Sequence, residues 1–392
     1  MERVEERTLT LADEWNVERS SANVQRPTVR HLYVHIPFCA RICPYCAFYK
    51  ERADPAQTQR FCEALLRELD ELAASHAIET ETIFFGGGTP TALTTAQLEF
   101  LLAGTGARLD LSQLAEWTIE ANPGSVSPRK AALLRALGVT RVSLGVQSWD
   151  DALLTVLGRE HNAAQAEQSF RILREAGHQN VNIDLMFGLP GQSLAQWEAT
   201  LARTIALSPE HVSAYCLTYE EDTEFFLRHQ RGEYLQDTAN DARFFETTMR
   251  VLESAGYEQY EISNYARPGF ESVHNRGYWY GEDYLGVGPS AFSTIGFERR
   301  QNVADYRRYS DRVLSSVSAI DSVEPLSPEI KRAEQTALLL RTRWGVPASW
   351  LDRSRREFTE FVELDLLMKS DGQFVLTQKG KLLADSVAAA FV

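Results

Sequence analysis

The chain has 392 residues, of which 44% are hydrophobic and 24% are charged, a balance ordinary for a folded globular protein. Its length predicts one large domain with one or two smaller ones. The formal net charge of −14 argues against nucleic acid as a main partner, because phosphate contacts need clustered Lys and Arg. No apolar run reaches the ~20 residues of a membrane span, and the N-terminus lacks a secretory signal. We therefore expect a cytoplasmic protein.

Short β-type runs alternate with longer helical patterns over the first 240 residues. Residues 1–29 come first, and their polar composition predicts a flexible arm. The predicted strands are Leu32–Ile36, Thr82–Phe85, Trp117–Ala121, Arg141–Val146, Val181–Phe187 and Val212–Leu217. The helical patterns between them include residues 61–72, 164–176 and 193–206, the last opened by Ser193 as a cap. This alternation predicts an α/β fold, either a partial (βα)₆ barrel over residues 30–240 or an open doubly wound sheet.

The pattern changes after residue 240. Residues 241–256 look helical, and the Tyr-, Gly- and Asn-rich stretch 257–302 predicts an irregular part of a linking segment, 241–326. Residues 327–392 follow a helix, helix, hairpin, helix order, which predicts a small winged-helix-like C-terminal domain. That domain carries ten basic and nine acidic side chains, so we interpret it as a lid or interaction module rather than a DNA reader.

Three cysteines lie close together in the stretch HIPFCARICPYCAFYKE. Cys39, Cys43 and Cys46 form a C-x₃-C-x₂-C array, which can hold three irons of a [4Fe–4S] cluster and leave the fourth iron open. The alternatives are a zinc knuckle or buried thiols, but zinc would want a fourth Cys or His at compact spacing. Cys62 and Cys216 fall in helical and strand-like patterns and are expected to be small core residues.

Polar residues follow the ends of several predicted strands, where an α/β fold gathers its chemistry. Gly86, Gly87 and Gly88 with Thr89 let backbone approach a ligand closely, and no Lys-Ser or Lys-Thr follows to make a phosphate loop. Glu120, Gln147, Arg159 and Asp184 follow in turn along the chain. Each residue alone has an ordinary structural explanation, but together they indicate a site for a small zwitterionic ligand.

These motifs resemble the radical S-adenosylmethionine superfamily, and within it the oxygen-independent coproporphyrinogen III oxidase-like branch. The similarity runs from about Leu32 to the C-terminus. The resemblance implies that the open iron chelates the amino and carboxylate groups of S-adenosylmethionine. It assigns cofactor contacts to Tyr33, Gly87, Gly88, Thr89, Glu120, Gln147, Arg159 and Asp184, and further ones to Tyr45 and Thr218.

Two details separate the members of this branch. The coproporphyrinogen-decarboxylating enzymes carry another cysteine two residues after the third ligand, whereas Phe48 stands there in this chain. A phenylalanine at that place is typical of the heme chaperones named HemW, and residues 274–279 match their H-N-x-x-Y-W motif. The resemblance implies that His274 contacts heme with Tyr278 and Trp279 alongside, and imidazole is a common axial ligand of heme iron.

The sequence thus predicts a heme-binding iron–sulfur protein that passes heme to an acceptor hemoprotein, such as a respiratory one. A homodimer is compatible with this prediction, and radical cleavage of S-adenosylmethionine is left open. The alternative is an oxygen-independent coproporphyrinogen III oxidase, which Phe48 and the His274 motif disfavour. A plain electron-transfer or iron-storage protein is a third hypothesis, and the triple-glycine loop and the polar strand ends disfavour it.

Overall fold

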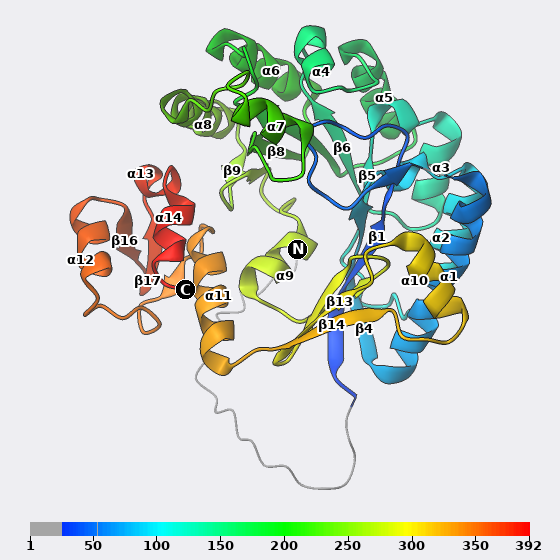
Figure 1. Ribbon diagram of the computed structural model, residues 1–392. Coiled ribbons are helices and arrows are strands. Elements are labelled where there is room, and N and C mark those ends of the chain that lie inside the picture. Colours follow the sequence, from blue (N-terminus) through cyan, green and yellow to red (C-terminus); the bar gives the residue numbers. More distant parts are fainter. Residues whose placement is uncertain (1–25, 53) are drawn as a thin grey trace, which may run out of the picture.

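The computed structural model describes residues 26–52 and 54–392, so most of the predicted N-terminal arm lies outside the described residues. Its main feature is a strongly curved sheet of twelve strands with helices around its outer side (Figure 1). Six parallel strands form the middle of this sheet and pair in sequence order. They are β1 (Thr28–Ile36), β4 (Ala77–Gly87), β5 (Glu116–Ala121), β6 (Arg141–Gln147), β7 (Val181–Phe187) and β8 (His211–Cys216). The predicted strands and the partial barrel are confirmed.

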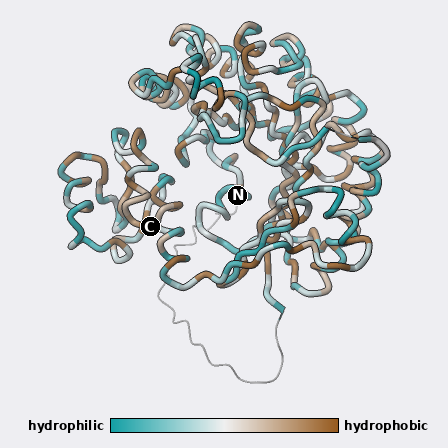
Figure 2. The backbone as a smooth tube through the Cα atoms, in the orientation of Figure 1, coloured by the Kyte–Doolittle hydropathy of each residue, from teal (hydrophilic) through white to brown (hydrophobic). Residues whose placement is uncertain are grey.

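The crossover helices cover the outer face of the sheet. They are α1 (Pro55–Ser75), α2 (Thr95–Gly106), α3 (Pro128–Ala136), α4 (Asp151–Val156), α5 (Ala163–Glu175) and α6 (Leu194–Leu207). Among them, α1, α5 and α6 are clearly amphipathic. Hydrophobic and hydrophilic stretches alternate along them (Figure 2). Ser193 caps α6 as predicted, because its hydroxyl accepts from the backbone of Gln196 in a capping box. After β8, α7 (Glu224–Gln230) and α8 (Thr238–Ser254) complete this side of the barrel.

The two faces of each parallel strand differ in chemistry. Outward side chains such as Ile83, Phe85 and Val142 are fully buried in one large hydrophobic core beneath the helices. Inward side chains, one residue away, are mostly polar, because successive side chains in a strand point to opposite faces. This inner face includes Thr82, Glu116, Thr118, Arg141, Ser143, Asn182 and His211, all of them buried. The barrel therefore has an apolar shell and a polar interior.

The segment 257–302 was predicted to be irregular, and this is wrong. It contains β9 (Glu258–Gln259), β10 (Asn264–Ala266), α9 (Val273–Tyr280), β11 (Tyr284–Val287), β12 (Phe292–Ile295) and β13 (Glu298–Asn302). Helix α9 lies inside the curve of the sheet (Figure 1). Strand β11 pairs in parallel with β1, about 250 residues earlier in the chain, and β12, β13 and β14 (Ile320–Pro325) extend that edge. The strands of the predicted linking segment therefore belong to the sheet. The segment also contains the helix α10 (Tyr306–Leu314).

The C-terminal residues form a smaller unit with its own hydrophobic core. Its elements are α11 (Pro328–Leu340), β15 (Val346–Pro347), α12 (Arg356–Glu363), β16 (Leu367–Ser370), β17 (Gln373–Leu376), α13 (Gln378–Lys381) and α14 (Ala384–Ala389). The three strands make one small sheet in the order β15-β17-β16. Helix α11 packs against α9. Among the described residues, we find no helix with the length and apolarity that crossing a bilayer requires.

Candidate functional site

The cysteine loop begins directly after β1. Cys39 ends the two-residue strand β2 (Phe38–Cys39), which pairs with β3 (Glu51–Arg52), and Cys43 and Cys46 lie in the loop between them. Phe38 anchors the start of the loop, because its ring packs edge-on against Phe61 at 4.9 Å and Tyr306 at 5.2 Å. All three thiols are half-buried and unpaired. The loop therefore stands on the core while its sulfur atoms remain available.

Two of the predicted cofactor contacts lie against the cysteine sulfur atoms. The Thr89 hydroxyl donates to Cys39 Sγ at 3.6 Å, and Arg159 Nη1 donates to Cys43 Sγ at 3.5 Å. A second Arg159 nitrogen donates to the Gly145 carbonyl at 2.7 Å, which fixes the guanidinium in place. Burial raises the pKa of the Cys39 thiol to about 11, against the opposing effect of the Thr89 hydrogen bond. Deprotonation of this thiol therefore needs a positive partner such as a metal.

The three thiols do not converge on one point. No group of three His, Cys, Asp or Glu side chains within the described ranges is placed to hold a single ion. A cubane cluster makes a different demand, because each thiolate binds its own iron and the sulfurs surround the cluster instead of meeting at its centre.

The glycine-rich loop at the end of β4 passes directly over the start of the cysteine loop. Gly87 has φ +107°, and a Cβ there would lie 2.4 Å from the His35 ring. A Cβ on Gly88 would lie 2.6 Å from the backbone of Pro37. The glycines are thus required by packing within the chain itself, and the Gly87 N–H donates to Glu120 at 3.1 Å.

Two acids face the interior near this loop. Burial, and then the nearby charge of Asp184, raise the pKa of Glu120 to about 8. Asp184 accepts hydrogen bonds from Ser143 at 2.9 Å and from Asn182 at 2.6 Å. A buried acid with a raised pKa gains from a cationic or hydroxyl partner, which an amino group or a ribose would supply. Gln147 ends β6 at a β-bulge with φ +68°, beside the Arg159 guanidinium.

The remaining predicted cofactor contacts, Tyr33, Tyr45 and Thr218, lie at different distances from the barrel interior. The Tyr33 hydroxyl donates to Nδ1 of His35 at 3.0 Å, since Nε2 of that histidine donates to the Tyr49 carbonyl. Tyr45 follows Cys43 and packs against Phe225. Thr218 lies just after β8, is exposed, and donates to Glu220 at 2.9 Å. Tyr33 thus points into the barrel, whereas Thr218 lies at its rim.

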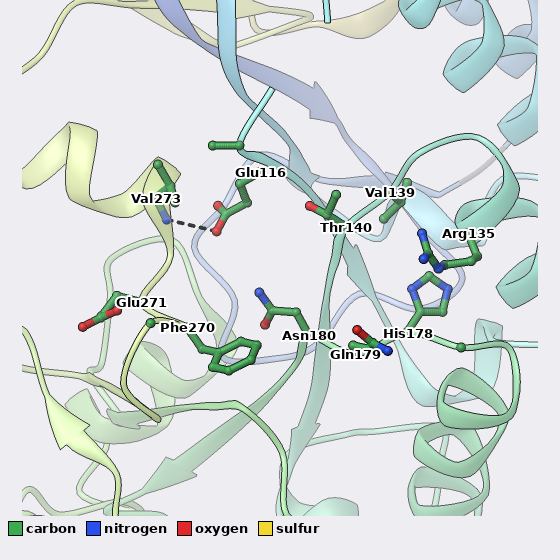
Figure 3. Close-up of a pocket in the computed structure, with 13 residues that line it drawn as sticks. Glu116, Arg135, Val139, Thr140, His178, Gln179, Asn180, Phe270, Glu271 and Val273 are labelled. Carbon is green, nitrogen blue, oxygen red and sulfur yellow. Dashed lines mark hydrogen bonds between the residues drawn. The ribbon is translucent and has the colours of Figure 1, made fainter. Parts of the chain in front are cut away.

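Helix α9 carries the H-N-x-x-Y-W motif and is fixed at its N-terminus by one buried acid. Glu116, the first residue of β5, accepts from the Ser272 hydroxyl at 3.0 Å and the His274 N–H at 3.1 Å. It also accepts from the Val273 N–H at 3.0 Å (Figure 3). A carboxylate at a helix N-terminus is favoured by the unpaired N–H groups and the helix dipole.

His274 is 1% exposed and lies inside the barrel. Its Nδ1 is 2.7 Å from the hydroxyl of Thr82, and its buried Nε2 has no hydrogen-bond partner within the described structure. Burial lowers the pKa of His274 to about 3, so the ring is neutral. Phe84 stacks on the imidazole at 5.1 Å and Tyr278 meets it edge-on at 4.9 Å. The result is a neutral imidazole with one open nitrogen in an aromatic setting.

The structure brings Tyr278 to His274 but not Trp279. Residues four apart share a helix face, whereas the fifth residue turns away. Trp279 instead lies beneath the guanidinium of Arg341, which follows α11, at 5.9 Å from the ring centre. The three predicted heme contacts therefore divide between the barrel interior and the C-terminal unit.

The cysteine site and His274 lie at different heights along the same strand. Thr82 and Gly87 are five residues apart on β4, which corresponds to about 16 Å at the usual rise of a strand. Phe84 lies between them and contacts both Tyr33, at 6.1 Å, and His274. Sequence reasoning missed Phe84, Thr82 and Glu116. The alternation of His31, Tyr33 and His35 was the available signal for a polar inner face.

Two cavities flank these sites. One of about 500 Å³ borders Ala40 and Thr89 beside the cysteine loop. The other, of about 310 Å³, lies at the amino-terminal ends of β5 to β7, and Glu116, His178, Asn180 and Val273 are among its lining residues (Figure 3). The second cavity adjoins the start of α9 and lies at the end of the barrel opposite the cysteines.

Comparison with known proteins agrees with this arrangement. Residues 33–204 match the model of the Radical SAM superfamily. The structure resembles that of coproporphyrinogen III oxidase (HemN) from Escherichia coli, described as a Radical SAM enzyme, with a TM-score of 0.81. That match covers 94% of this chain and 90% of the other at 24% identity, which establishes the fold. Fold and cysteine loop thus define a radical SAM-type protein.

Closer relatives narrow the class. "Heme chaperone HemW" of Bacillus subtilis (strain 168) is 35% identical over 383 residues, which cover 93% of this chain and 99% of the relative. The protein of the same name from Escherichia coli (strain K12) is 40% identical over 268 residues, which cover 68% of this chain and 70% of the relative. The chain belongs to the HemW family.

Proposed function

We propose that this protein binds heme and passes it to an acceptor hemoprotein, such as a respiratory one, in the cytoplasm. It would carry a [4Fe–4S] cluster on Cys39, Cys43 and Cys46 and bind S-adenosylmethionine at the open iron. The name shared by its relatives supports the heme role, and the two groups of residues inside one barrel support the pairing of the two sites.

The residues around the cysteine loop suit a cluster with S-adenosylmethionine. Arg159 and Thr89 already donate to two of the thiols and would go on donating to sulfur when iron is bound. Glu120 offers an acid for a hydroxyl or amino group. A bound and reduced cluster would supply an electron to the sulfonium group, and Arg159, Thr89 and Glu120 would hold the cluster and the cofactor in place.

The observation that carries the heme proposal is the open Nε2 of His274. A neutral imidazole nitrogen that is buried without a partner is suited to an axial bond to heme iron, and Phe84 and Tyr278 suit a porphyrin face. The ring is 1% exposed. Heme access therefore requires the packing around this ring to open.

A titration with hemin tests this proposal. Purified protein should take up about one heme per chain with a shift of the Soret band, and His274→Ala should lose that uptake. His229→Ala is the matched control, because that histidine lies on α7 and its ring bonds to the Tyr234 carbonyl. Full uptake by His274→Ala, or equal loss in His229→Ala, would contradict the assignment.

A second experiment separates the chaperone from the oxidase. Anaerobically reconstituted protein with S-adenosylmethionine, a reductant and coproporphyrinogen III should release no decarboxylated product. The oxidases carry an extra cysteine at the position that Phe48 occupies in this chain. Phe48 is 71% exposed, so a hydrocarbon ring and not a thiol faces solvent at that position. Product formation at a catalytic rate would overturn the chaperone proposal in favour of the enzyme.

The metal itself is tested by substitution. Replacing all three cysteines of the loop by alanine should abolish the brown chromophore and the iron content. Replacing the buried Cys62 by alanine is the control and should leave both unchanged, because this thiol lies on the buried face of α1. An unchanged iron content in the triple variant would show that other residues bind the metal.

A further inference from the structure

A chain of hydrogen bonds runs from the surface of the protein to His274. Glu282, whose side chain is 46% exposed, lies 2.7 Å from Nε2 of the buried His31. Nδ1 of His31 lies 2.8 Å from the Thr82 hydroxyl, and that hydroxyl lies 2.7 Å from Nδ1 of His274. The chain ends at Nε2 of His274, which has no hydrogen-bond partner in the described part of the protein.

The donors and acceptors along this chain follow from its first member. A carboxylate only accepts, so Nε2 of His31 carries a proton and donates to Glu282. If Nδ1 of His31 carries no proton, it accepts from the Thr82 hydroxyl. The Thr82 oxygen then accepts in turn, and the group 2.7 Å away that can donate to it is an N–H at Nδ1 of His274. The single proton of the neutral His274 ring is therefore on Nδ1, and Nε2 is a bare lone pair.

The opposite arrangement leaves a buried donor without an acceptor. If His31 donated from both nitrogens, the Thr82 hydroxyl would have to donate to Nδ1 of His274. The proton of the neutral His274 ring would then be on Nε2, for which the described residues supply no acceptor. Buried N–H groups without partners are rare because they lose their hydrogen bonds to water without replacement.

We propose that Thr82, oriented by His31 and Glu282, is a positioning residue that keeps Nε2 of His274 free of a proton and so able to bind heme iron. This inference rests on the proposed role of His274 as the heme ligand. Second partners of ligating histidines commonly fix the tautomer and the ring orientation. Here the partner is the Thr82 hydroxyl, and its orientation is determined through His31 by the Glu282 carboxylate at the surface.

The tautomer can be measured in the protein without heme. Labelling histidine with ¹⁵N gives eight side chains, and His274 is identified by the signal that is missing in His274→Ala. Ring nitrogens with and without a proton differ widely in ¹⁵N chemical shift. We expect a protonated Nδ1 and a bare Nε2 in the wild type. A proton on Nε2 in the wild type would overturn the inference.

Two substitutions at one position make the test specific. Thr82→Val has nearly the same shape and suits a strand, but it removes the acceptor, so the proton should move to Nε2, the form that an isolated neutral imidazole favours. Thr82→Ser keeps the hydroxyl and should keep the wild-type tautomer. If Thr82→Val also retains the proton on Nδ1, the hydroxyl does not control the ring.

Heme binding by the same variants distinguishes the ligand role of His274 from the positioning role of Thr82. Thr82→Val should raise the dissociation constant for heme about 10–100-fold, the usual effect of losing such a partner, and Thr82→Ser should stay close to wild type. If His274→Ala keeps full heme uptake, the proposed ligand is wrong whatever its tautomer. If His274→Ala loses heme but Thr82→Val binds it as the wild type does, the ligand stands and the role of Thr82 is overturned.

Discussion

Glu116→Gln should loosen α9 without unfolding the barrel. Glu116 is 3% exposed and accepts three hydrogen bonds from the first turn of the helix. Hydrogen bonds to a charged group contribute about 1.5–3 kcal/mol each. Glutamine keeps one acceptor oxygen but turns its NH₂ group towards at least one of these donors. We estimate a loss of about 3 kcal/mol in the free energy of opening α9, which is roughly a 100-fold rise in the open population.

Hydrogen exchange followed by mass spectrometry measures this opening directly. Peptides that cover residues 272–281 should exchange about 100-fold faster in Glu116→Gln, while peptides from β6 and β7 should be unchanged. Glu99→Gln, on the exposed side of α2, is the control with the same chemical change. If exchange in α9 is unchanged in Glu116→Gln, the carboxylate does not hold the helix, and heme access must be controlled elsewhere.

Three further predictions concern single residues. Burial raises the pKa of Glu68 from about 4.5 to about 7, so its contribution to stability is fully present below pH 4.5 and is lost as the pH rises through 7. The melting temperature of wild type relative to Glu68→Gln should therefore fall between pH 5 and pH 8, and a difference that stays constant or grows contradicts this. Gly88→Ala should lower the free energy of unfolding by about 1–3 kcal/mol, because the added Cβ would meet the Pro37 backbone. Gly124→Ala is the control and should not lower it, because a Cβ there would meet no described atom within 4 Å. Equal melting temperatures of the two variants would contradict this. Arg159→Met removes the hydrogen-bond donor to Cys43, so the reconstituted cluster should bleach in air about tenfold faster than in the wild type. Arg171→Met, at an exposed arginine, is the control and should bleach at the wild-type rate. Equal bleaching rates in the two variants would show that the Arg159 guanidinium does not protect the cluster.

The parallel strands could be predicted because each is recognisable without its partners. Outward residues such as Val142, Leu144 and Val146 are apolar at every second position, and helices with clear periodicity separate the strands. The cysteine motif was equally easy to recognise in the sequence, because its three cysteines lie within eight residues. These features are local, so the local sequence was enough.

Helix α9 and strand β11 were missed for the opposite reason. Strand β11 has only four residues and is stabilised by β1, more than 240 positions earlier. The start of α9 is fixed by Glu116, which is 156 to 158 positions away in the chain. No window of the sequence contains both partners. Thr82 was invisible in another way, because a threonine in a strand is ordinary and only its contact with His274 makes it distinctive.

The register between β1 and β4 places residues of the two proposed sites in one column on the inner face of the sheet. His31 lies opposite Thr82, Tyr33 opposite Phe84, and His35 opposite Gly86, so the inner face carries three successive pairs. The first pair faces His274, and the last adjoins the glycine-rich loop. A shift of one residue would turn all these side chains outward. Pairing with β11 on the other side of β1 fixes its register a second time.

This column also makes the two sites separable by mutation. Thr82 and Gly86 point the same way but are about 13 Å apart along β4, so a change at one should not reach the other through direct contact. Tyr33 and Phe84 are the exception, because they form the pair between the two sites and Phe84 stacks on His274. Phe84→Leu is therefore the substitution expected to affect both heme uptake and S-adenosylmethionine binding. A defect confined to one ligand would show that the two sites are insulated from each other inside the barrel.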